Sequence, residues 1–107
     1  METLSQAGFD VVVAEVDRGL CRLPDYMRDG MRRYIVQGIP PGDFMSAVLK
    51  NDLMEAFGRA DDTNQRFMHN YAMFLYNDAP RGCYGSPNAF YEWCKEGGLQ
   101  GMLEPVS

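Results

Sequence analysis

The residues that could perform catalysis or bind a metal are few in this chain. It contains one histidine, His69, and three cysteines, Cys21, Cys83 and Cys94. A cysteine nucleophile needs an activating partner, so a thiol active site would pair His69 with Cys83 or Cys94. A zinc site needs closely spaced ligands such as a CxxC pair, which the sequence lacks. We therefore expect no catalytic residues, no metal and no cofactor, and free thiols in a reducing cytosol, with a Cys83–Cys94 disulfide as the alternative.

Paired carboxylates are the next candidates for chemistry. Asp61 and Asp62 are adjacent, and Asp52 and Glu55 are three residues apart. Acid–base catalysis of the glycosidase kind needs two carboxyl groups that face each other across a cleft. Neighbours on one short helix do not provide that geometry. These acids are predicted to cap helices or to lie in solvent.

A proline- and glycine-containing segment, residues 38–43, has the superficial look of a phosphate-binding loop. It reads GIPPGD. It lacks the lysine and the serine or threonine of a Walker loop, and its prolines remove N–H groups that would hold an anion. The segment is predicted to be a stiff connection between two helices.

An arginine cluster has more potential for binding. Half of the ten basic residues lie within sixteen positions, and Tyr26 and Tyr34 nearby offer rings for base stacking or cation–π contacts. Asp25 and Asp29 interleave with the arginines and partly neutralise them. Three interpretations stay open: a salt-bridged surface, a surface for a protein partner, and a nucleic-acid contact. The arginines are Arg18, Arg22, Arg28, Arg32 and Arg33.

The composition is that of one globular domain with an excess of acidic residues. The chain has 107 residues, 46% of them hydrophobic and 23% charged, and a net charge of −5. These are ordinary globular values, and the negative charge disfavours bulk attraction to nucleic acid. No apolar run approaches the roughly 18 residues of a membrane span. The apolar stretch from Phe9 to Val16 contains acids and has no basic segment before it, unlike a signal peptide. We expect a cytoplasmic protein that does not contact membranes.

Apolar spacing and capping residues predict the elements that would position these groups. Residues 24–37 are predicted to form a helix that Gly38 ends. Pro41 is predicted to open the next helix, with Asp43 facing the positive end of its dipole. The apolar stripe then shifts by roughly 100° at Leu53, Ala56 and Phe57, so a break is expected near residue 51, with Asn51 or Asp52 as the cap of a short further helix.

The remaining elements follow from similar signals. Caps at residues 61–63 and a stop at Pro80 predict one central helix, and Ser86 with Gly97 or Gly98 delimits a last one. Residues 1–22 stay open between an arm, a helix and a short strand. The predicted fold is therefore all-α, a compact bundle of four to five short helices over residues 23–99, with an N-terminal arm at 1–22 and a tail at 100–107.

Two methionines stand apart from the predicted core stripes. The chain contains eight methionines, and Met54 and Met73 do not follow the apolar faces of their helices. Methionine is common on adaptable binding surfaces. Met54 and Met73 are therefore predicted to mark an exposed apolar patch.

Several segments together resemble a known family. They are GIPPGDFMSAVLKNDL, GRAD, LYNDAP and GSPNAFYEW. Over about residues 23–99 the chain is similar to a family of small phage- and prophage-encoded proteins of unknown function. The resemblance implies a viral accessory gene expressed in a bacterial cytoplasm, and it supplies no catalytic residues. Genes of this kind often bind a host protein, including components of host defence, so an anti-CRISPR-like role is an expectation by analogy.

The leading hypothesis is thus a non-enzymatic protein that binds a host protein or protein complex. The predicted partner contacts are Arg28, Arg32, Arg33, Met54 and Met73. The alternative is a small nucleic-acid-binding protein that uses the segment from Arg22 to Arg33, which the net charge disfavours.

Overall fold

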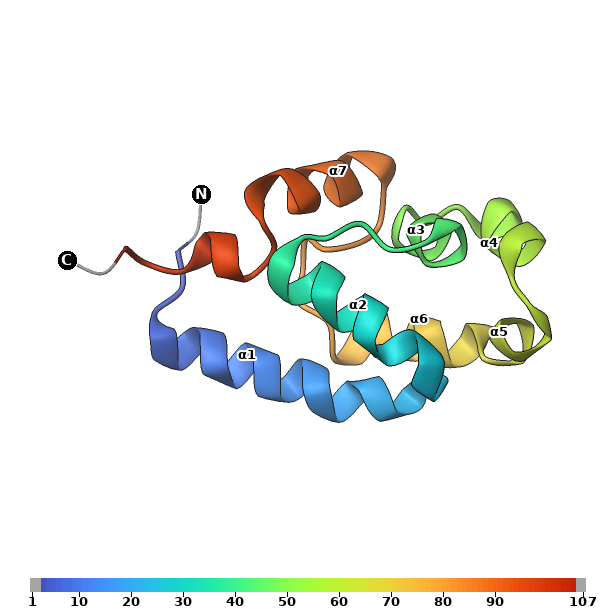
Figure 1. Ribbon diagram of the computed structural model, residues 1–107, viewed down its shortest axis with the longest axis horizontal. Coiled ribbons are helices and arrows are strands. Elements are labelled where there is room, and N and C mark those ends of the chain that lie inside the picture. The colour runs from blue at the N-terminus through green and yellow to red at the C-terminus, as the bar shows by residue number, and fades with distance from the viewer. Residues whose placement is uncertain (1–2, 106–107) are drawn as a thin grey trace.

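Seven α-helices and two short 3₁₀ turns make up the computed structural model, which describes residues 3–105 (Figure 1). No sheet occurs among these residues, where a single isolated β-bridge is the one strand-like contact. The α-helices are α1 (Gln6–Gly19), α2 (Asp25–Gln37), α3 (Asp43–Leu49), α4 (Leu53–Arg59), α5 (Asp62–Arg66), α6 (Met68–Asn77) and α7 (Pro87–Glu96), and the 3₁₀ turns are η1 (Leu20–Arg22) and η2 (Gln100–Met102).

Helix α2 lies at the centre of the molecule and forms where the sequence predicts it. Pro24 precedes its first turn, and Gly38 ends it in the left-handed conformation at φ +74°. That conformation carries little penalty in glycine, which has no Cβ. The inward face of α2 supplies Met31, Tyr34 and Ile35, all fully buried. Helix α2 packs against α1, α7 and η2.

A predicted break separates α3 from α4. Asn51 adopts a positive φ of 62°, and the Asp52 carboxylate caps α4 by accepting a hydrogen bond from the Glu55 N–H at 3.2 Å. The break rotates the apolar face, as expected. Helix α3 turns most of its apolar residues into the core, whereas Ala56 is the buried residue of α4.

The predicted single central helix is wrong, because the chain bends at Phe67. Phe67 is the C-cap of α5, and its N–H bonds to the carbonyls of Thr63 and Asn64 at 3.2 and 3.1 Å. Helix α6 begins at the next residue, Met68. Asn64 is the buried polar side chain of this region, and its Oδ1 accepts a hydrogen bond from the Tyr71 hydroxyl at 2.8 Å. This bond ties the short α5 to the inward face of α6.

Helix α7 has the predicted ends and locks onto α2. The Ser86 hydroxyl accepts a hydrogen bond from the Ala89 N–H at 3.1 Å, and Gly97 ends the helix at φ +83°. Two buried aromatic residues of α7 reach α2. The indole N–H of Trp93 donates to the Tyr34 and Ile35 carbonyls at 3.1 and 3.2 Å, and the Phe90 ring stacks on Tyr34 with centroids 5.3 Å apart.

Residues 6–19 are a helix, so the short-strand alternative is wrong for this segment. Val16 is fully buried and Leu20 nearly so, and both belong to the core that α2 and α7 share. The expected arm is therefore packed onto the domain over its described part. At the other end, the Leu4 N–H bonds to the Met102 carbonyl at 2.6 Å, and the Glu104 N–H bonds to the Leu4 carbonyl at 2.8 Å. Residues 1–2 of the expected arm and 106–107 of the expected tail lie outside the described residues.

The all-α fold class is confirmed, while the predicted count of four to five helices is too low. The extra elements are α1, whose β-branched residues left its type open, and the additional helix created by the bend at Phe67. None of the helices described here combines the length and the apolar character needed to cross a membrane.

Candidate functional site

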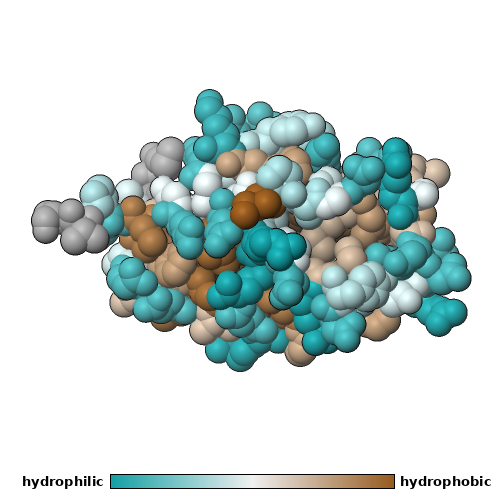
Figure 2. Space-filling view, viewed as in Figure 1, coloured by the Kyte–Doolittle hydropathy of each residue, from teal (hydrophilic) through white to brown (hydrophobic). Residues whose placement is uncertain are grey.

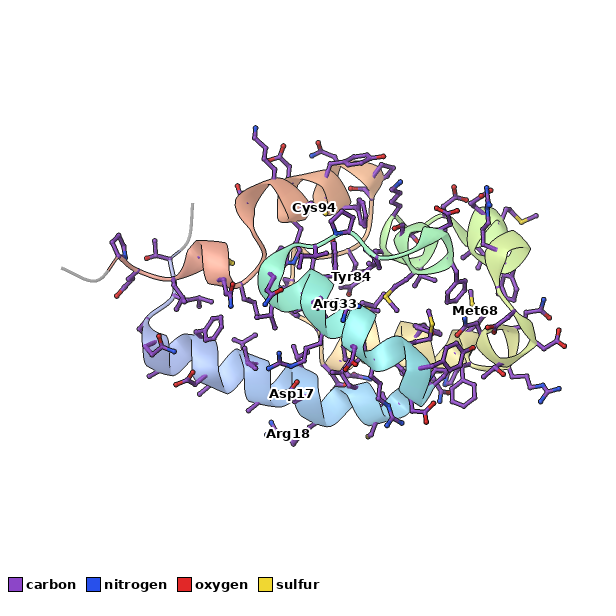
Figure 3. All side chains as sticks on the ribbon, in the orientation of Figure 1. Asp17, Arg18, Arg33, Met68, Tyr84 and Cys94 are labelled. Carbon is purple, nitrogen blue, oxygen red and sulfur yellow. The ribbon has the colours of Figure 1, made fainter. Side chains whose placement is uncertain are left out.

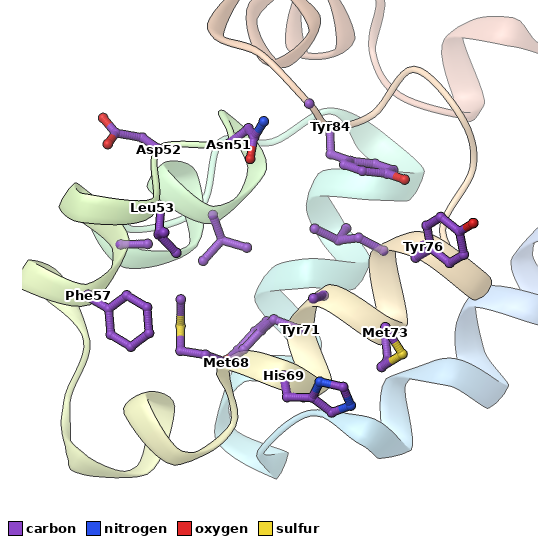
Figure 4. Close-up of a pocket in the computed structure, with 15 residues that line it drawn as sticks. Asn51, Asp52, Leu53, Phe57, Met68, His69, Tyr71, Met73, Tyr76 and Tyr84 are labelled. Atoms are coloured by element: carbon purple, nitrogen blue, oxygen red, sulfur yellow. The ribbon is translucent and has the colours of Figure 1, made fainter.

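An apolar groove lies between α4 and α6 on the described surface (Figure 4). Its volume is about 510 Å³. Helix α4 forms one wall, α6 forms the other, and the loop before α7 closes it with Tyr84. The side chains that define it are Leu53, Phe57, Met68, Met73, Tyr76 and Tyr84.

The α4 wall exposes apolar side chains because the break at Asn51 turns this short helix away from the core. Leu53 and Phe57 lie one turn apart and both line the groove. Leu53 is 61% exposed and Phe57 is also exposed. Met54, the next residue in the chain, is 81% exposed but does not line the groove. Exposed apolar residues that gather on one surface are typical of an interaction site.

The α6 wall is the outer face of an amphipathic helix. Tyr71, Phe74 and Leu75 are buried, and two of them, Tyr71 and Leu75, also line the groove. The more exposed face of the helix follows the helical period and adds His69, Ala72, Met73 and Tyr76 to the lining. Tyr76 is 79% exposed. Two helices therefore present neighbouring rows of largely apolar side chains with a hollow between them.

The charge of this groove is simple. Asp52, which lies at the rim beside the start of α4, is its one carboxylate (Figure 4). No lysine or arginine of the described chain lines it. Asp52 is exposed, and within the described residues only its Oδ1, which caps α4, takes part in a hydrogen bond. The rim of an otherwise uncharged surface thus carries one negative charge.

The arginine cluster is largely engaged in contacts within the fold. Arg28 donates to the backbone carbonyls of Leu23 and Cys21 at 3.0 and 3.4 Å, which fastens η1 to α2. Arg32 forms an ion pair with Asp17 of α1 at 2.8 Å. In Figure 3, α1 with Asp17 and Arg18 runs beside α2, which carries Arg33. Of the arginines predicted as partner contacts, Arg28 and Arg32 are therefore structural links between elements.

Arg22, the last residue of η1, also links two elements of the fold. Its Nε bonds to the Asp78 carboxylate at 2.8 Å, which joins η1 to the end of α6. Ion pairs of this kind neutralise the positive charge that a nucleic-acid surface needs. Within the segment from Arg22 to Arg33, Arg22 and Arg32 pair with carboxylates and Arg28 bonds to backbone carbonyls.

Arg33 lies in a second, polar hollow between α2 and the loop before α3. This hollow has a volume of about 640 Å³ and mixes Arg33 and Arg59 with Asp29, Asp43 and Asp61. Two pairs of its groups interact: Arg59 pairs with Asp43 at 3.5 Å, and the Tyr26 hydroxyl donates to Asp61 at 2.6 Å and lowers the pKa of that carboxyl. Figure 2 shows a mostly hydrophilic face, with hydrophobic atoms visible in a hollow beside α3 and α4.

The thiols and His69 are placed in different environments. Cys83 is fully buried, and burial raises the pKa of its thiol to about 12. His69 lies on the exposed face of α6, at the groove. Cys94 is half-buried, and burial raises its pKa although Lys50 opposes the shift. All three cysteines are free, and no cluster of three metal-ligating residues is present in the part of the chain that the structure describes.

These environments predict three different thiol reactivities. With a thiol-specific disulfide reagent near neutral pH, the exposed Cys21 should react first, the half-buried Cys94 more slowly, and Cys83 after unfolding alone. The time course of thiolate release measures this, and Cys21→Ser should remove the fast phase. Rapid reaction of Cys83 in the folded protein would contradict the burial that the structure shows.

Comparisons with known proteins supply no relative for this chain. No protein-family model matches it, and neither a curated protein nor a solved structure does. The candidate site therefore depends on the geometry above.

The sequence signalled part of the groove and missed the rest. Met54 is exposed, as predicted, whereas Met73 is half-buried and lines the groove. Leu53 and Phe57 formed a helical stripe, which is typical of a core face, yet both are exposed. A stripe shows that a helix has an apolar face but not whether another element covers it. Tyr76 and Tyr84 carried no signal of their own.

Proposed function

We propose that this chain is a non-enzymatic phage accessory protein that binds a host macromolecule in the bacterial cytoplasm, and that the groove between α4 and α6 is its binding surface. The observation that carries the proposal is the row of exposed apolar side chains along that groove, Leu53 and Phe57 on one wall and Tyr76 on the other. The phage origin and a target in host defence, as for anti-CRISPR proteins, rest on the resemblance of residues 23–99.

The residue types of the groove suit a protein partner. Aromatic residues and methionine are enriched where protein interfaces are buried, and charged residues are depleted there. The groove offers Phe57, Tyr76 and Tyr84 together with Met68 and Met73, and Asp52 is the carboxylate at its edge. Methionine adapts its shape to a partner because its side chain is unbranched and flexible.

A matched pair of substitutions tests whether the groove carries binding. Leu53→Glu and Val11→Glu each place a carboxylate at a similarly exposed apolar residue, at 61% and 58% exposure. Leu53 is the first residue of α4, where a negative charge faces the favourable end of the dipole, so the fold should persist. Val11 lies on α1 and does not line the groove.

Affinity capture from lysate of a bacterial host, followed by mass spectrometry, gives the measurement. The wild type and Val11→Glu are expected to recover the same host protein, and Leu53→Glu to recover at least about tenfold less, as for the loss of an interface hot spot. Circular dichroism of each variant checks folding. Equal recovery by both variants, or no protein above background with the wild type, would overturn the proposal.

A further inference from the structure

We infer that the occupant of the groove is an amphipathic helix of a partner protein, with apolar residues on one face and lysine or arginine beside them. The inference rests on the proposed function and names the chemistry of the partner. It follows from the shape of the walls, from their length and from the charge at the rim.

The shape of the walls favours a helix over an extended strand. Both walls are helices that present side chains, and an extended peptide binds by adding to an open sheet edge. The one β-bridge of the described residues joins Leu4 to Leu103, and neither residue lines the groove. A helix that lays its apolar face between two rows of side chains needs no such edge.

The length of the walls fits about two turns of helix. On α6 the row runs from His69 to Tyr76, which at 1.5 Å per residue is about 10 Å. On α4, which forms the opposite wall, Leu53 and Phe57 are four residues apart and therefore span about one helical turn. A partner helix would thus seat apolar residues at positions i, i+4 and i+7.

The charge at the rim selects the residues beside those anchors. Asp52 is exposed and accepts one hydrogen bond through Oδ1, and no hydrogen bond or ion pair of the described residues engages its other oxygen. No lysine or arginine of the described chain lines the groove to repel a cation, and the whole chain carries a net charge of −5. A basic side chain at the end of a docked helix can therefore pair with Asp52, while an acidic one meets uncompensated negative charge.

Three synthetic peptides of about 18 residues, long enough to form helix, test the inference against the ¹⁵N-labelled full chain. One has leucines at i, i+4 and i+7 with flanking lysines. The second has the same leucines with flanking glutamates. The third has the composition of the first with the leucines redistributed so that no apolar face forms. Chemical-shift changes map the site, and their titration gives the dissociation constants.

The lysine-flanked peptide is expected to shift the signals of Leu53, Phe57 and Tyr76 and to bind about fivefold tighter than the glutamate-flanked one, the advantage that one exposed ion pair provides. The redistributed peptide should bind at least about tenfold more weakly. Asp52→Asn keeps a good helix cap and should remove most of the preference for lysine. Asp10→Asn on α1 makes the same change in net charge away from the groove and should keep that preference.

The outcomes separate this inference from the proposed function. Equal binding of the lysine and glutamate peptides, shifts that map elsewhere, or no binding of any peptide would overturn the basic-helix inference. If Leu53→Glu still abolishes capture of a host protein in that case, the groove remains the binding surface for a partner of other chemistry. If the peptides discriminate as expected but Leu53→Glu captures the host protein normally, the proposed function fails instead.

Discussion

Gly98→Ala is expected to destabilise the fold by at least about 3 kcal/mol, because two independent costs act at this position. Gly98 has φ +65°, a conformation that strains any residue with a Cβ. An added Cβ would also lie 2.6 Å from the Gly38 nitrogen and 2.7 Å from the Ile35 carbonyl oxygen. Both neighbours are backbone atoms and cannot rotate away, so the ends of α2 and α7 would have to separate.

Gly30→Ala is the matched control for Gly98→Ala, because it is expected to raise the stability of the fold. Gly30 lies inside α2, and an added Cβ would meet no atom within 4 Å. Alanine is favoured over glycine in a helix interior by about 0.5–1 kcal/mol, so this variant should be more stable than the wild type. Urea unfolding followed by circular dichroism measures both variants. If Gly98→Ala unfolded at the wild-type midpoint, the close crossing of Gly38 and Gly98 would be wrong.

Trp93→Ala should destabilise the protein by about 3–5 kcal/mol, the range for removing a large buried aromatic side chain. Trp93 is 7% exposed and is the residue through which α7 bonds to the last turn of α2. Alanine would leave a cavity between these helices. It would also remove the indole donor of the Tyr34 and Ile35 carbonyls.

Trp93→Phe separates these two contributions. Phenylalanine keeps much of the apolar volume and lacks the N–H. Each carbonyl retains one donor, the Gly38 N–H for Tyr34 at 2.8 Å and the Leu99 N–H for Ile35 at 3.0 Å. The loss should therefore be about 1 kcal/mol for the hydrogen bond, plus a smaller packing term.

Tyr91→Ala, on the exposed side of α7, is the control; it removes the contacts of Tyr91 with Lys50 and should cost about 1 kcal/mol or less. Urea unfolding with circular dichroism, as for the glycine variants, measures all three variants. Equal losses for Trp93→Phe and Trp93→Ala would show that the N–H, not the ring, holds α7 in place.

Local signals in the sequence predicted the helix ends and the break at Asn51 well. Asp52, Ser86, Gly38 and Gly97 act at or next to the chain positions where they stand, since a cap is a contact within a few residues. The features that depend on distant packing were harder to predict. The valines of α1 suit either a strand or a helix, and the contact of Val16 with the core decides in favour of the helix.

The groove itself illustrates the same limit. Leu53 and Phe57 have the spacing of a core face, and the sequence contains nothing that says which neighbour will cover them. In the structure the buried residues of α6 belong to the shared core, where Tyr71 contacts Phe44 of α3, while Leu53 and Phe57 of α4 stay exposed at the groove. Composition could predict the acidic character of the chain, but not that the groove lining would contain one carboxylate and no cation.

The bridge between Leu4 and Leu103 has a consequence for how the molecule can be held. It brings both described ends of the chain to one extremity of a body that measures 48 × 26 × 19 Å (Figure 1). Helices α4 and α5 occupy the opposite extremity. A tether attached near either end therefore leaves the α4 wall of the groove facing away from the support. Because Leu4 and Leu103 lie side by side, a short linker between these two residues could close the described chain and allow new ends to be opened in a surface loop.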